Sequence, residues 1–465
     1  MTFNADLLLR RLHDLQGGTA AGRYLVGFSG GLDSTVLLHA LRQLAARSLP
    51  TVPVVPVVAV HINHALHPHA VAWQEHCREV AEKLEVDFVA RELVVDEHGA
   101  GLEAAARDAR YAALKELMQD GDVLLSAHHE EDQAETLLLN LLRGSGLAGL
   151  AAIGACQPFG RGRLIRPMLG VSRHAIERYA REHSLVWVED PSNLDLRFDR
   201  NYLRQVVLPP LRRRWPAVAA RLSHTAELAG EAARLQDDLA ELDLRSLVDP
   251  PGDDAAGAPD RLDILELCKL SGPRQRNALR YAIKACGLPQ APASRLRQVQ
   301  DELLPAREDA QPLVRWRGGE VRRYRRKLYL LPESVAEGRI ERAEPPLLYG
   351  DGSQVAIGAA PGMLRLEKVA AGETGIDPAV TAGGLQLRFR AGGEKIRPYG
   401  RRESRPLKKL LQERGVLPWM RQNVPLLYAG ETLVAVADLW IAQDCARDGG
   451  FRVRWDGKPS LFQAE

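Results

Sequence analysis

Six consecutive residues near the N-terminus have the composition of a phosphate-binding loop. Ser29-Gly30-Gly31-Leu32-Asp33-Ser34 directly follow the apolar run Tyr24–Phe28, and a helical pattern begins after them. Adjacent glycines let the backbone approach a phosphate, and the N–H groups and dipole of a helix N-terminus favour the anion. The segment matches neither G-x-x-x-x-G-K-[ST] nor G-x-G-x-x-G. We therefore predict a different nucleotide loop; the alternative is a glycine-rich turn in which Asp33 or Ser34 caps the helix.

A second group of reactive side chains lies where a predicted strand passes into a helix. It contains His128, Glu131, Asp132 and Glu135. Asp132 and Glu135 are three residues apart, so they share one helix face. One of these acids could hold Mg²⁺ or orient an amine, and His128 could contact a phosphate or a base. Helix capping is the alternative, because the first turn of a helix favours acidic residues.

Four histidines close to one another suggest a zinc site at first sight. They are His61, His64, His67 and His69. The segment has no H-E-x-x-H pattern, and Pro68 separates the later pair. We therefore favour contacts to a nucleotide at a strand end, or surface histidines, over a metal site.

The first 215 residues alternate short β-branched runs with helical patterns, which predicts a Rossmann-like α/β fold with a mostly parallel sheet. In such sheets ligands bind beyond the carboxyl ends of the strands, where the reactive segments fall. Helices are expected from about Ser34, Val71, Gly101 and Glu130. The expected strands are Arg23–Phe28, Val54–Ile62, Asp87–Val95 and Asp122–Ala127.

The remaining 250 residues divide into two further predicted domains. A long amphipathic helix is expected from about Pro216 to Leu247, followed by a linker rich in Pro, Gly and Asp over 248–260. We predict a first domain over 1–215, a small mainly helical domain over 216–335 and a small α+β domain over 347–465. The second ends in a basic strand or hairpin, and the third includes a helix over Pro406–Arg414.

Positive charge is concentrated in two segments of an almost neutral chain. The 465 residues carry 62 basic and 60 acidic side chains. Arg315–Lys327 has a net charge of +6, with Trp316 and Tyr324 among its arginines, and Arg388–Arg414 has a net charge of +7. Solvated protein faces would explain such runs, but local basic patches also suit RNA binding.

The cysteines and the apolar segments exclude several classes of protein. The five cysteines are far apart and form no C-x-x-C pair, which argues against a disulfide framework or a cysteine metal site. Asp6 and Arg10 interrupt the N-terminal apolar stretch, unlike a signal peptide. Pro53 and Pro56 break the longest apolar run, so we expect no membrane contact and a cytoplasmic protein.

The loop and the segments that follow it resemble a known family. Ser29–Ser34 is similar to the pyrophosphate loop, or PP-loop, of ATP pyrophosphatases. The order of the other motifs resembles the tRNA(Ile)-lysidine synthetase family within that superfamily. The resembling segments include Val60–Leu66, Gly101–Tyr111, Ser126–Thr136, Arg143–Gly146, Arg166–Leu169, Glu189–Asn193, Arg200–Arg204, Gly392–Glu394 and Ser404–Leu410.

The resemblance implies an ATP-dependent ligase that acts on a tRNA(Ile) with a CAU anticodon. ATP would adenylate the C2 oxygen of the cytidine at the first anticodon position. Free L-lysine would then displace AMP and leave lysidine in the tRNA. The implied cofactors are ATP and Mg²⁺, and the resemblance leaves a homodimer open.

The resemblance also assigns roles to particular residues of this chain. Residues 29–34 would bind ATP, and Asp132 would bind Mg²⁺. Arg107 and its helix neighbour Arg110 would bind ATP phosphate, lysine carboxylate or tRNA, with a surface salt bridge as the alternative. Glu131 departs from the family, which usually has Asp at that position. The residues implied to be catalytic are Asp33, Arg107, His128, Asp132 and Arg204.

Two other functions are considered beside this one. Another PP-loop tRNA-modifying enzyme, such as a tRNA thiolase, would use the same adenylation. Thiolases usually carry paired cysteines, whereas no two cysteines here are closer than 18 positions. An RNA-binding protein with a decayed catalytic half is the other alternative, and the intact loop and Asp132 argue against it.

Overall fold

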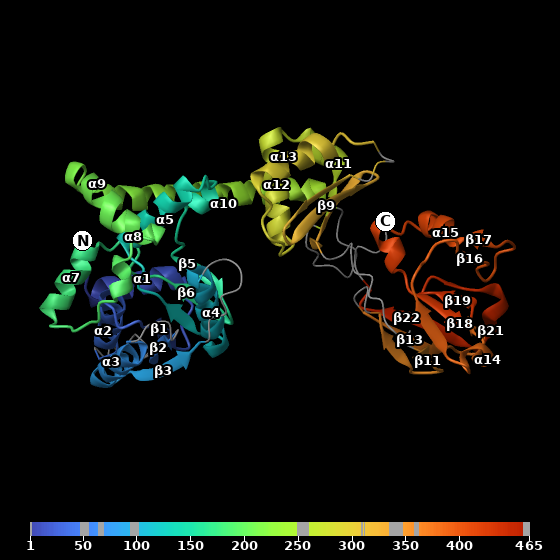
Figure 1. Ribbon diagram of the computed structural model, residues 1–465, viewed down its shortest axis with the longest axis horizontal. Coiled ribbons are helices and arrows are strands. Elements are labelled where there is room, and N and C mark those ends of the chain that lie inside the picture. Colours follow the sequence, from blue (N-terminus) through green and yellow to red (C-terminus); the bar gives the residue numbers. More distant parts are fainter. Residues whose placement is uncertain are drawn as a thin grey trace. The chain divides into compact units, whose positions relative to one another are not determined.

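The computed structural model describes residues 2–46, 55–63, 69–93, 102–248, 260–307, 310, 312–333, 347–357 and 362–458. These residues form two compact units, Met1–Gln236 and Asp237–Glu465 (Figure 1). In the described part of the chain, no helix is both long and apolar enough to cross a membrane.

The first unit is built on a six-stranded sheet with the order β3-β2-β1-β4-β6-β5. Its neighbours pair in parallel except β5, which runs antiparallel to β6 at one edge. This confirms the predicted α/β class. The strands are β1 (Tyr24–Gly27), β2 (Val57–Asn63), β3 (Asp87–Glu92), β4 (Val123–Leu125), β5 (Cys156–Phe159) and β6 (Gly162–Ile165).

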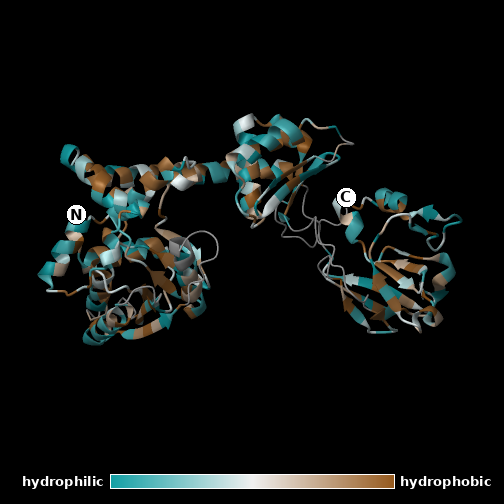
Figure 2. Cartoon of the chain, in the orientation of Figure 1, coloured by the Kyte–Doolittle hydropathy of each residue, from teal (hydrophilic) through white to brown (hydrophobic). Residues whose placement is uncertain are grey.

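Helices cover both faces of this sheet, and its strands carry many hydrophobic residues (Figures 1 and 2). Val26, Ala59 and Leu125 belong to one hydrophobic cluster, whereas Leu25 and Leu124 belong to another. Successive strand residues point to opposite faces, so these hydrophobic strands are buried on both sides. The main helices are α1 (Ala5–Gln16), α2 (Leu32–Ala46), α3 (Ala70–Lys83), α4 (Leu102–Leu117), α5 (Glu130–Leu142) and α7 (Arg173–Glu182).

The β5–β6 hairpin was not expected from the sequence, and a close backbone contact places it. A Cβ built on Gly162 would lie 1.9 Å from the carbonyl oxygen of Asp122, so only glycine fits there. The Asp122 carboxylate is buried and accepts hydrogen bonds from Arg23 Nε at 2.9 and 3.0 Å. β6 therefore extends the parallel sheet beside β4, and Arg166 follows directly after it.

Short helical segments after α7 carry several basic residues of the first unit. They are α8 (Asp199–Tyr202), a π-helical turn (Leu203–Val207) and α9 (Leu208–Arg214). π-helical turns are uncommon and frequently occur at functional sites. Arg200 lies on α8 and Arg204 on the π-helical turn.

The long helix α10 (Val218–Leu247) crosses from the first unit into the second. Its C-terminal half is tied to α12 (Gly272–Ala285) by ion pairs, since Asp243 contacts Arg274 and Asp237 contacts Arg280. Four antiparallel strands follow the order β7-β10-β9-β8. The remaining elements of this part are β7 (Arg261–Asp263), α11 (Ile264–Lys269), α13 (Ala293–Gln298), β8 (Leu313–Trp316), β9 (Gly319–Tyr324) and β10 (Lys327–Leu331).

The C-terminal part of the second unit contains two five-stranded sheets, with the orders β11-β15-β18-β19-β20 and β12-β13-β22-β14-β21. Helix α15 (Leu407–Glu413) packs its leucines into the core, where Leu407, Leu410 and Leu411 are fully buried. The strands are β11 (Leu347–Leu348), β12 (Gln354–Ala356), β13 (Met363–Lys368), β14 (Thr374–Ile376), β15 (Leu385–Arg388), β18 (Leu426–Ala429), β19 (Thr432–Val436), β20 (Trp440–Ile441), β21 (Ala446–Asp448) and β22 (Phe451–Asp456).

Candidate active site

The predicted loop begins just after β1, includes the first turn of α2 and is closed by its own hydroxyl groups. Ser34 Oγ donates to the Gly31 carbonyl at 3.1 Å and accepts from the Ser29 amide at 3.3 Å. Gly30 has a φ of +79°, and a Cβ built on it would lie 2.8 Å from Cys77 Sγ. Leu32 is buried and begins α2. The loop therefore offers backbone and hydroxyl groups to a ligand, while Leu32 anchors it to the core.

Asp33 is the loop residue that faces the second predicted group. Its Oδ2 atom lies 3.6 Å from His129 Nε2, and its Oδ1 atom is buried without a hydrogen-bond partner among the described residues. The helix begins before Asp33, so this side chain is not the cap of α2. The structure thus brings together Asp33 and the start of α5, about 100 residues apart in the sequence.

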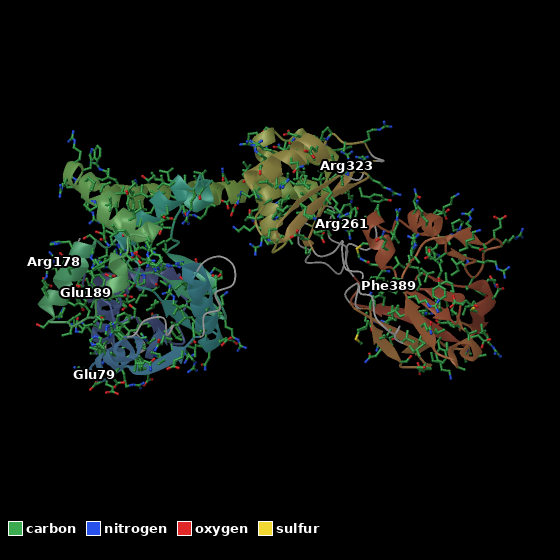
Figure 3. The ribbon with its side chains drawn as sticks, viewed as in Figure 1. Glu79, Arg178, Glu189, Arg261, Arg323 and Phe389 are labelled. Atoms are coloured by element: carbon green, nitrogen blue, oxygen red, sulfur yellow. The ribbon has the colours of Figure 1, made fainter. Side chains whose placement is uncertain are left out.

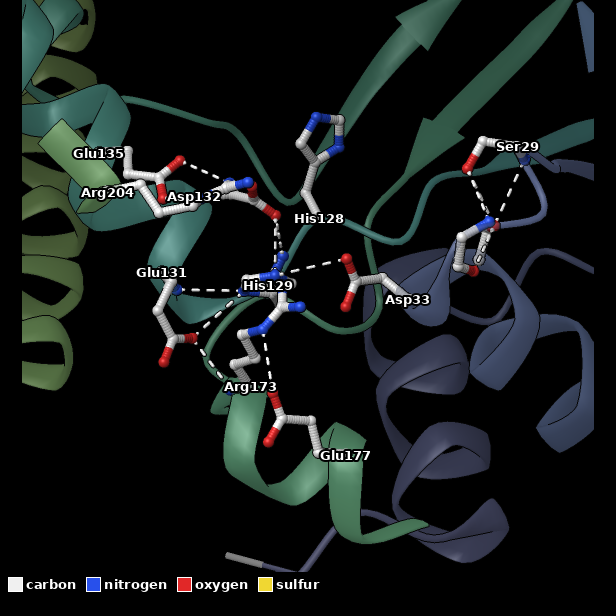
Figure 4. Close-up of polar contacts among 12 residues, drawn as sticks. Ser29, Asp33, His128, His129, Glu131, Asp132, Glu135, Arg173, Glu177 and Arg204 are labelled. Carbon is white, nitrogen blue, oxygen red and sulfur yellow. Dashed lines mark hydrogen bonds and ion pairs between the residues drawn. The ribbon is translucent and has the colours of Figure 1, made fainter. Parts of the chain in front are cut away.

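His129 occupies the centre of this group, although the sequence reasoning gave it no role (Figure 4). Its side chain is 1% exposed, and Nε2 lies 3.5 Å from Asp132 Oδ2 as well as near Asp33. Burial alone would lower the pKa of His129, but Asp132, Asp33 and Glu131 outweigh it and raise the pKa to about 10. The only sequence signal for His129 is its place directly before three acidic residues.

The protonation state of the His129 ring determines which hydrogen bond it makes to Glu131. His129 Nδ1 lies 3.2 Å from the Glu131 carboxylate and 3.2 Å from the Glu131 amide. Only a neutral ring could accept from the amide at this atom. Because three carboxylates favour the charged ring, we assign Nδ1–H as a donor to the Glu131 carboxylate.

Glu131 links α5 to α7 instead of joining Asp132. Its Oε2 atom accepts a hydrogen bond from the Arg173 amide at 2.9 Å, in the first turn of α7. Its Oε1 atom lies 3.4 Å from Arg212. A carboxylate at a helix N-terminus is favoured by the exposed N–H groups and the helix dipole. The contact with α7 therefore places Glu131, the residue at which the resembling family usually has Asp.

Asp132 and Glu135 share a face of α5, as their spacing predicted, and two arginines bind both. Arg204 Nε lies 2.7 Å from Glu135 Oε1, and Arg200 Nε lies 2.8 Å from Glu135 Oε2. Asp132 Oδ1 is 3.2 Å from Arg200 and 3.5 Å from Arg204. Burial would raise the pKa of Asp132, but His129 and Arg200 outweigh it and hold the pKa at about 2.

His128 lies beside these groups, with its ring turned away from the contacts of His129 (Figure 4). Ser126 Oγ and His128 Nδ1 are 2.7 Å apart. Burial lowers the pKa of His128 to about 3, and the charges of Arg166, Arg200 and Arg110 act in the same direction against Asp132. His128 is therefore neutral at neutral pH and can exchange hydrogen bonds with a ligand.

Arg107 and Arg110 lie on α4 near the ring of Tyr111, with guanidinium carbons 5.2 and 5.6 Å from its centroid. Arg107 is exposed, whereas Arg110 is partly buried. Burial lowers the pKa of Arg110, and the charges of Arg107 and then Arg200 act in the same direction. Arg107 lies at the exposed edge of the same group.

Among the described residues, no group of three or more ligand-type side chains could hold a metal ion, and His61 and His69 are the two described members of the four histidines noted in the sequence. His61 is buried, and its Nδ1 atom lies 3.0 Å from the Phe28 carbonyl oxygen. His69 precedes α3. His64 and His67 lie outside the described residues, so their predicted contact to a nucleotide stays a prediction.

Much of the first basic segment stabilises the second unit itself. Arg315 and Arg322 both bind Glu320, which is fully buried. Arg323, labelled in Figure 3, donates to the Leu303 and Leu304 carbonyls. Trp316 is buried and donates to the Pro289 carbonyl at 2.8 Å. These side chains already form ion pairs or hydrogen bonds within the second unit. The segment therefore offers less positive charge to an RNA than the sequence suggests.

The second basic segment is different because many of its side chains are exposed. Arg401 and Arg405 contact only the exposed Glu413 among described carboxylates, at 3.4 and 2.8 Å. Arg402 and Lys408 are also exposed. Surface pairs of this kind contribute little to stability.

Three family models match successive parts of the chain. A PP-loop domain matches residues 5–211, a TilS substrate binding domain matches residues 262–329, and a TilS substrate C-terminal domain matches residues 385–455. The first match supports ATP binding.

Curated relatives match nearly the whole chain. A tRNA(Ile)-lysidine synthase of Alkalilimnicola ehrlichii is 43% identical over 94% of this chain and 94% of its own length. The proteins of the same name from Coxiella burnetii and Pseudomonas aeruginosa are 38% and 41% identical. They cover 95% and 96% of this chain, and 93% and 96% of their own lengths.

Proposed function

The chain belongs to the tRNA(Ile)-lysidine synthase family, and from that premise we propose how its site makes lysidine. The substrate is a tRNA(Ile) with a CAU anticodon, and its cytidine at the first anticodon position reacts. In the first step the C2 oxygen attacks the α-phosphorus of ATP, and pyrophosphate leaves. In the second step an amine of free L-lysine attacks C2, the C2–O bond breaks, and AMP leaves with the oxygen.

The observation that carries this proposal is the contact between the loop and α5 through His129. Its Nε2 atom lies 3.6 Å from Asp33 and 3.5 Å from Asp132. Asp33 belongs to the loop that would hold the departing pyrophosphate, and Asp132 belongs to the face that would receive the amine. Holding the two groups together suits a reaction whose two steps occur at the same base.

Each predicted catalytic residue has a role that suits its charge. Asp132 orients the lysine amine rather than accepting its proton, because a pKa of about 2 makes it a weak base. Arg204 fixes Glu135 and Asp132, and it can also stabilise negative charge on the leaving phosphate. Neutral His128 exchanges hydrogen bonds with the base, and exposed Arg107 contacts phosphate or tRNA.

Mg²⁺ is proposed as the metal of the adenylation step, with Asp33 and Asp132 as the residues that would hold it, and Asp132 would orient the lysine amine only in the second step. Magnesium usually binds one or two carboxylates together with substrate phosphates, so a cluster of three protein ligands is not needed. The unpartnered Oδ1 atom of Asp33 fits this role. The bound ion would neutralise charge on the phosphates.

The predicted division of labour among three domains is part of the proposal. We propose that residues 1–215 carry the chemistry, and that 216–335 and 347–465 bind the tRNA. The matches to a substrate binding domain and a substrate C-terminal domain support this division. A homodimer stays a prediction, which sedimentation of the full chain would test.

The deciding experiment is incubation of the full chain with tRNA(Ile), ATP, Mg²⁺ and labelled lysine, followed by nucleoside analysis. We expect label in lysidine, with one AMP and one pyrophosphate released for each lysidine. A tRNA thiolase would need a sulfur donor and would leave no labelled lysine in the tRNA. An RNA-binding protein with a decayed site would bind the tRNA and release no pyrophosphate.

A further inference from the structure

An exposed apolar stripe lies on the short helical segments that follow α7. We call it the aromatic stripe and define it as Phe198, Tyr202 and Val206, which are 38, 48 and 39% exposed. Phe198 precedes α8, Tyr202 ends it and Val206 lies in the π-helical turn. Residues four positions apart on a helix are neighbours, so the three form one line. Exposed apolar side chains that gather in this way mark an interaction surface.

Three hydrogen bonds fix the support of the aromatic stripe. Asn201 is buried, and its Nδ2 atom donates to the carbonyls of Ser192 and Asp195, both at 2.9 Å. Gln205 Nε2 donates to the Asn193 carbonyl at 2.7 Å. The loop before α8 is therefore tied to α8 and to the π-helical turn. A surface that is already fixed loses less conformational entropy when a ligand binds to it.

The opposite side of the same segment belongs to the candidate active site. Arg200 and Arg204 are each two positions from Tyr202, about half a turn away on a helix. Both bind Glu135, at 2.8 and 2.7 Å, so this side faces α5 (Figure 1). A helix with its side chains is about 10 Å across. An RNA strand whose cytidine reaches Asp132 therefore has its neighbouring nucleotides within reach of the aromatic stripe.

Weakly held positive charge lies beside the aromatic stripe. Arg143 Nη2 lies 3.4 Å from the carboxylate of Asp199, and both side chains are mostly exposed. Asp199 is next to Phe198 in the chain, so Arg143 lies close to the stripe. An exposed pair of this kind contributes little to stability, so Arg143 can leave Asp199 for a phosphate. Arg213 and Arg214, on α9 after the π-helical turn, are exposed as well.

Aromatic rings among arginines fit single-stranded RNA better than a protein partner. The bases of an unpaired strand stack on exposed rings, while arginines bind its phosphates. An apolar protein surface would cover the rings but would leave the neighbouring arginines without complementary charge. The anticodon loop of the proposed substrate is unpaired, and it has to reach the site on the other side of the same helical segment.

We propose that the aromatic stripe stacks unpaired nucleotides of the anticodon loop next to the reacting cytidine, while Arg143 binds their phosphates. This inference rests on the proposed function and adds the residues of the first unit that position the RNA strand. Phe198 and Tyr202 are positioning residues, because they contact neighbouring nucleotides and no reacting atom. The chemistry remains with the loop at Ser29–Ser34 and with α5.

The first test removes one ring. Tyr202→Ala should weaken binding of tRNA(Ile) by about tenfold, within the range for loss of one base–aromatic stack. The KM for tRNA should rise accordingly, while kcat and the KM values for ATP and lysine stay nearly unchanged. Tyr202→Phe keeps the ring and should bind tRNA like the wild type. Phe198→Ala should act in the same way as Tyr202→Ala, and it carries the test if Tyr202→Ala does not fold.

A tRNA that lacks particular bases locates the contact. In this abasic tRNA, the two nucleotides that flank the reacting cytidine keep their phosphates and lose their bases. The wild type should bind it about tenfold more weakly than intact tRNA(Ile). Tyr202→Ala should bind the two RNAs about equally, because the stack is already lost. A purely structural role of Tyr202 would instead weaken the binding of both RNAs by the same factor, and that result would overturn the inference.

A matched pair of valine variants serves as a control for surface substitution. Val206→Ala shortens a side chain of the aromatic stripe and should weaken tRNA binding, though less than Tyr202→Ala does. Val71 lies on α3 and is more exposed than Val206. Val71→Ala makes the same change outside the stripe and should leave tRNA binding unchanged.

The outcomes distinguish this inference from the proposed function. If the wild type makes no lysidine, the proposed function fails. If it makes lysidine and the folded variants Tyr202→Ala and Phe198→Ala both bind tRNA like the wild type, the inference is wrong. A changed sedimentation of the free chain in these variants, with unchanged tRNA binding, would overturn it too and would assign the aromatic stripe to a second copy of the chain.

Discussion

Two pairs of the same residue types show how burial changes what an ion pair does. In the first unit, Arg204 binds Glu135, whose side chain is fully buried, at 2.7 Å. In the second unit, Arg405 binds Glu413, whose side chain is 48% exposed, at 2.8 Å. The distances are almost equal, but removing one partner of a buried pair leaves an unmatched charge, while an exposed pair exchanges freely with water.

The difference suits the two tasks of the enzyme. A reaction at one base needs charges fixed in position, and the ion pairs around His129 and Glu135 supply them. Binding along a tRNA needs charges that can leave a weak partner for a phosphate, and the exposed arginines of 388–414 can do so. The segment 315–327 lies between these extremes, since Glu320 is buried and occupies two of its arginines.

The largest effect is expected at the loop. Asp33→Ala should reduce adenylation by about 1,000-fold or more, the upper end for loss of one group that stabilises charge in a transition state. The affinity for tRNA should stay nearly unchanged, because the loop contacts ATP. Pyrophosphate release and filter binding of tRNA measure the two quantities. Full turnover by Asp33→Ala would contradict our proposal that the loop binds the phosphates of ATP.

Asp132→Asn should reduce lysidine formation by at least about 100-fold, the scale of a group that positions a reactant or a proton. The amide keeps the shape but loses the charge that attracts an amine. Glu131→Asp serves as the comparison and should stay active, since it restores the residue usual in the family. A near-normal rate for Asp132→Asn would favour the alternative interpretation, in which Asp132 only caps the helix.

His129→Gln tests burial directly by removing a charge that three carboxylates surround. It should lower the free energy of unfolding by about 3–5 kcal/mol, as expected when one partner of a buried charge network is removed. Arg405→Gln, its exposed counterpart, should cost no more than about 1 kcal/mol. Urea unfolding of both variants measures this, and equal losses would erase the contrast between the two regions.

The pH dependence of stability follows from the same histidine. The pKa of His129 is raised from 6.5 to about 10, so its contribution to stability is complete below pH 6.5 and is lost as the pH rises through 10. Asp132 acts in the opposite direction, because its pKa is lowered from 3.8 to about 2 and its contribution is lost as the pH falls through 2. The free energy of unfolding of His129→Gln should depend less on pH between 6.5 and 10 than that of the wild type.

The smallest change is expected from the exposed segment. Reversal of charge at Arg401, Arg402 and Lys408 should weaken tRNA binding moderately and reduce the salt slope by about one unit for each phosphate that the protein no longer binds. The ATP requirement should not change, because these residues lie outside the first unit. An unchanged salt slope would contradict a role for this segment in RNA binding.

Local patterns in the sequence were enough to predict the elements and most of the reactive residues. The expected strand Arg23–Phe28 contains β1, the helix expected from Glu130 is α5, and the helix expected over Pro216–Leu247 contains α10. Periodicity and glycine chemistry act over a few residues, so they can be read without a fold. The face shared by Asp132 and Glu135 follows from helix spacing in the same way.

What the sequence could not decide is which distant charges meet. The central position of His129 and the pairing of Glu135 with Arg200 and Arg204 join segments far apart in the chain. The burial of Glu320 and Trp316 likewise turned an apparent RNA-binding patch partly into core. These outcomes depend on strand order and on burial. Both change the strength of the interactions that a charged side chain makes, and neither leaves a local pattern in the sequence. The sequence therefore determined the chemical groups, and only the tertiary structure decided their partners and their protonation.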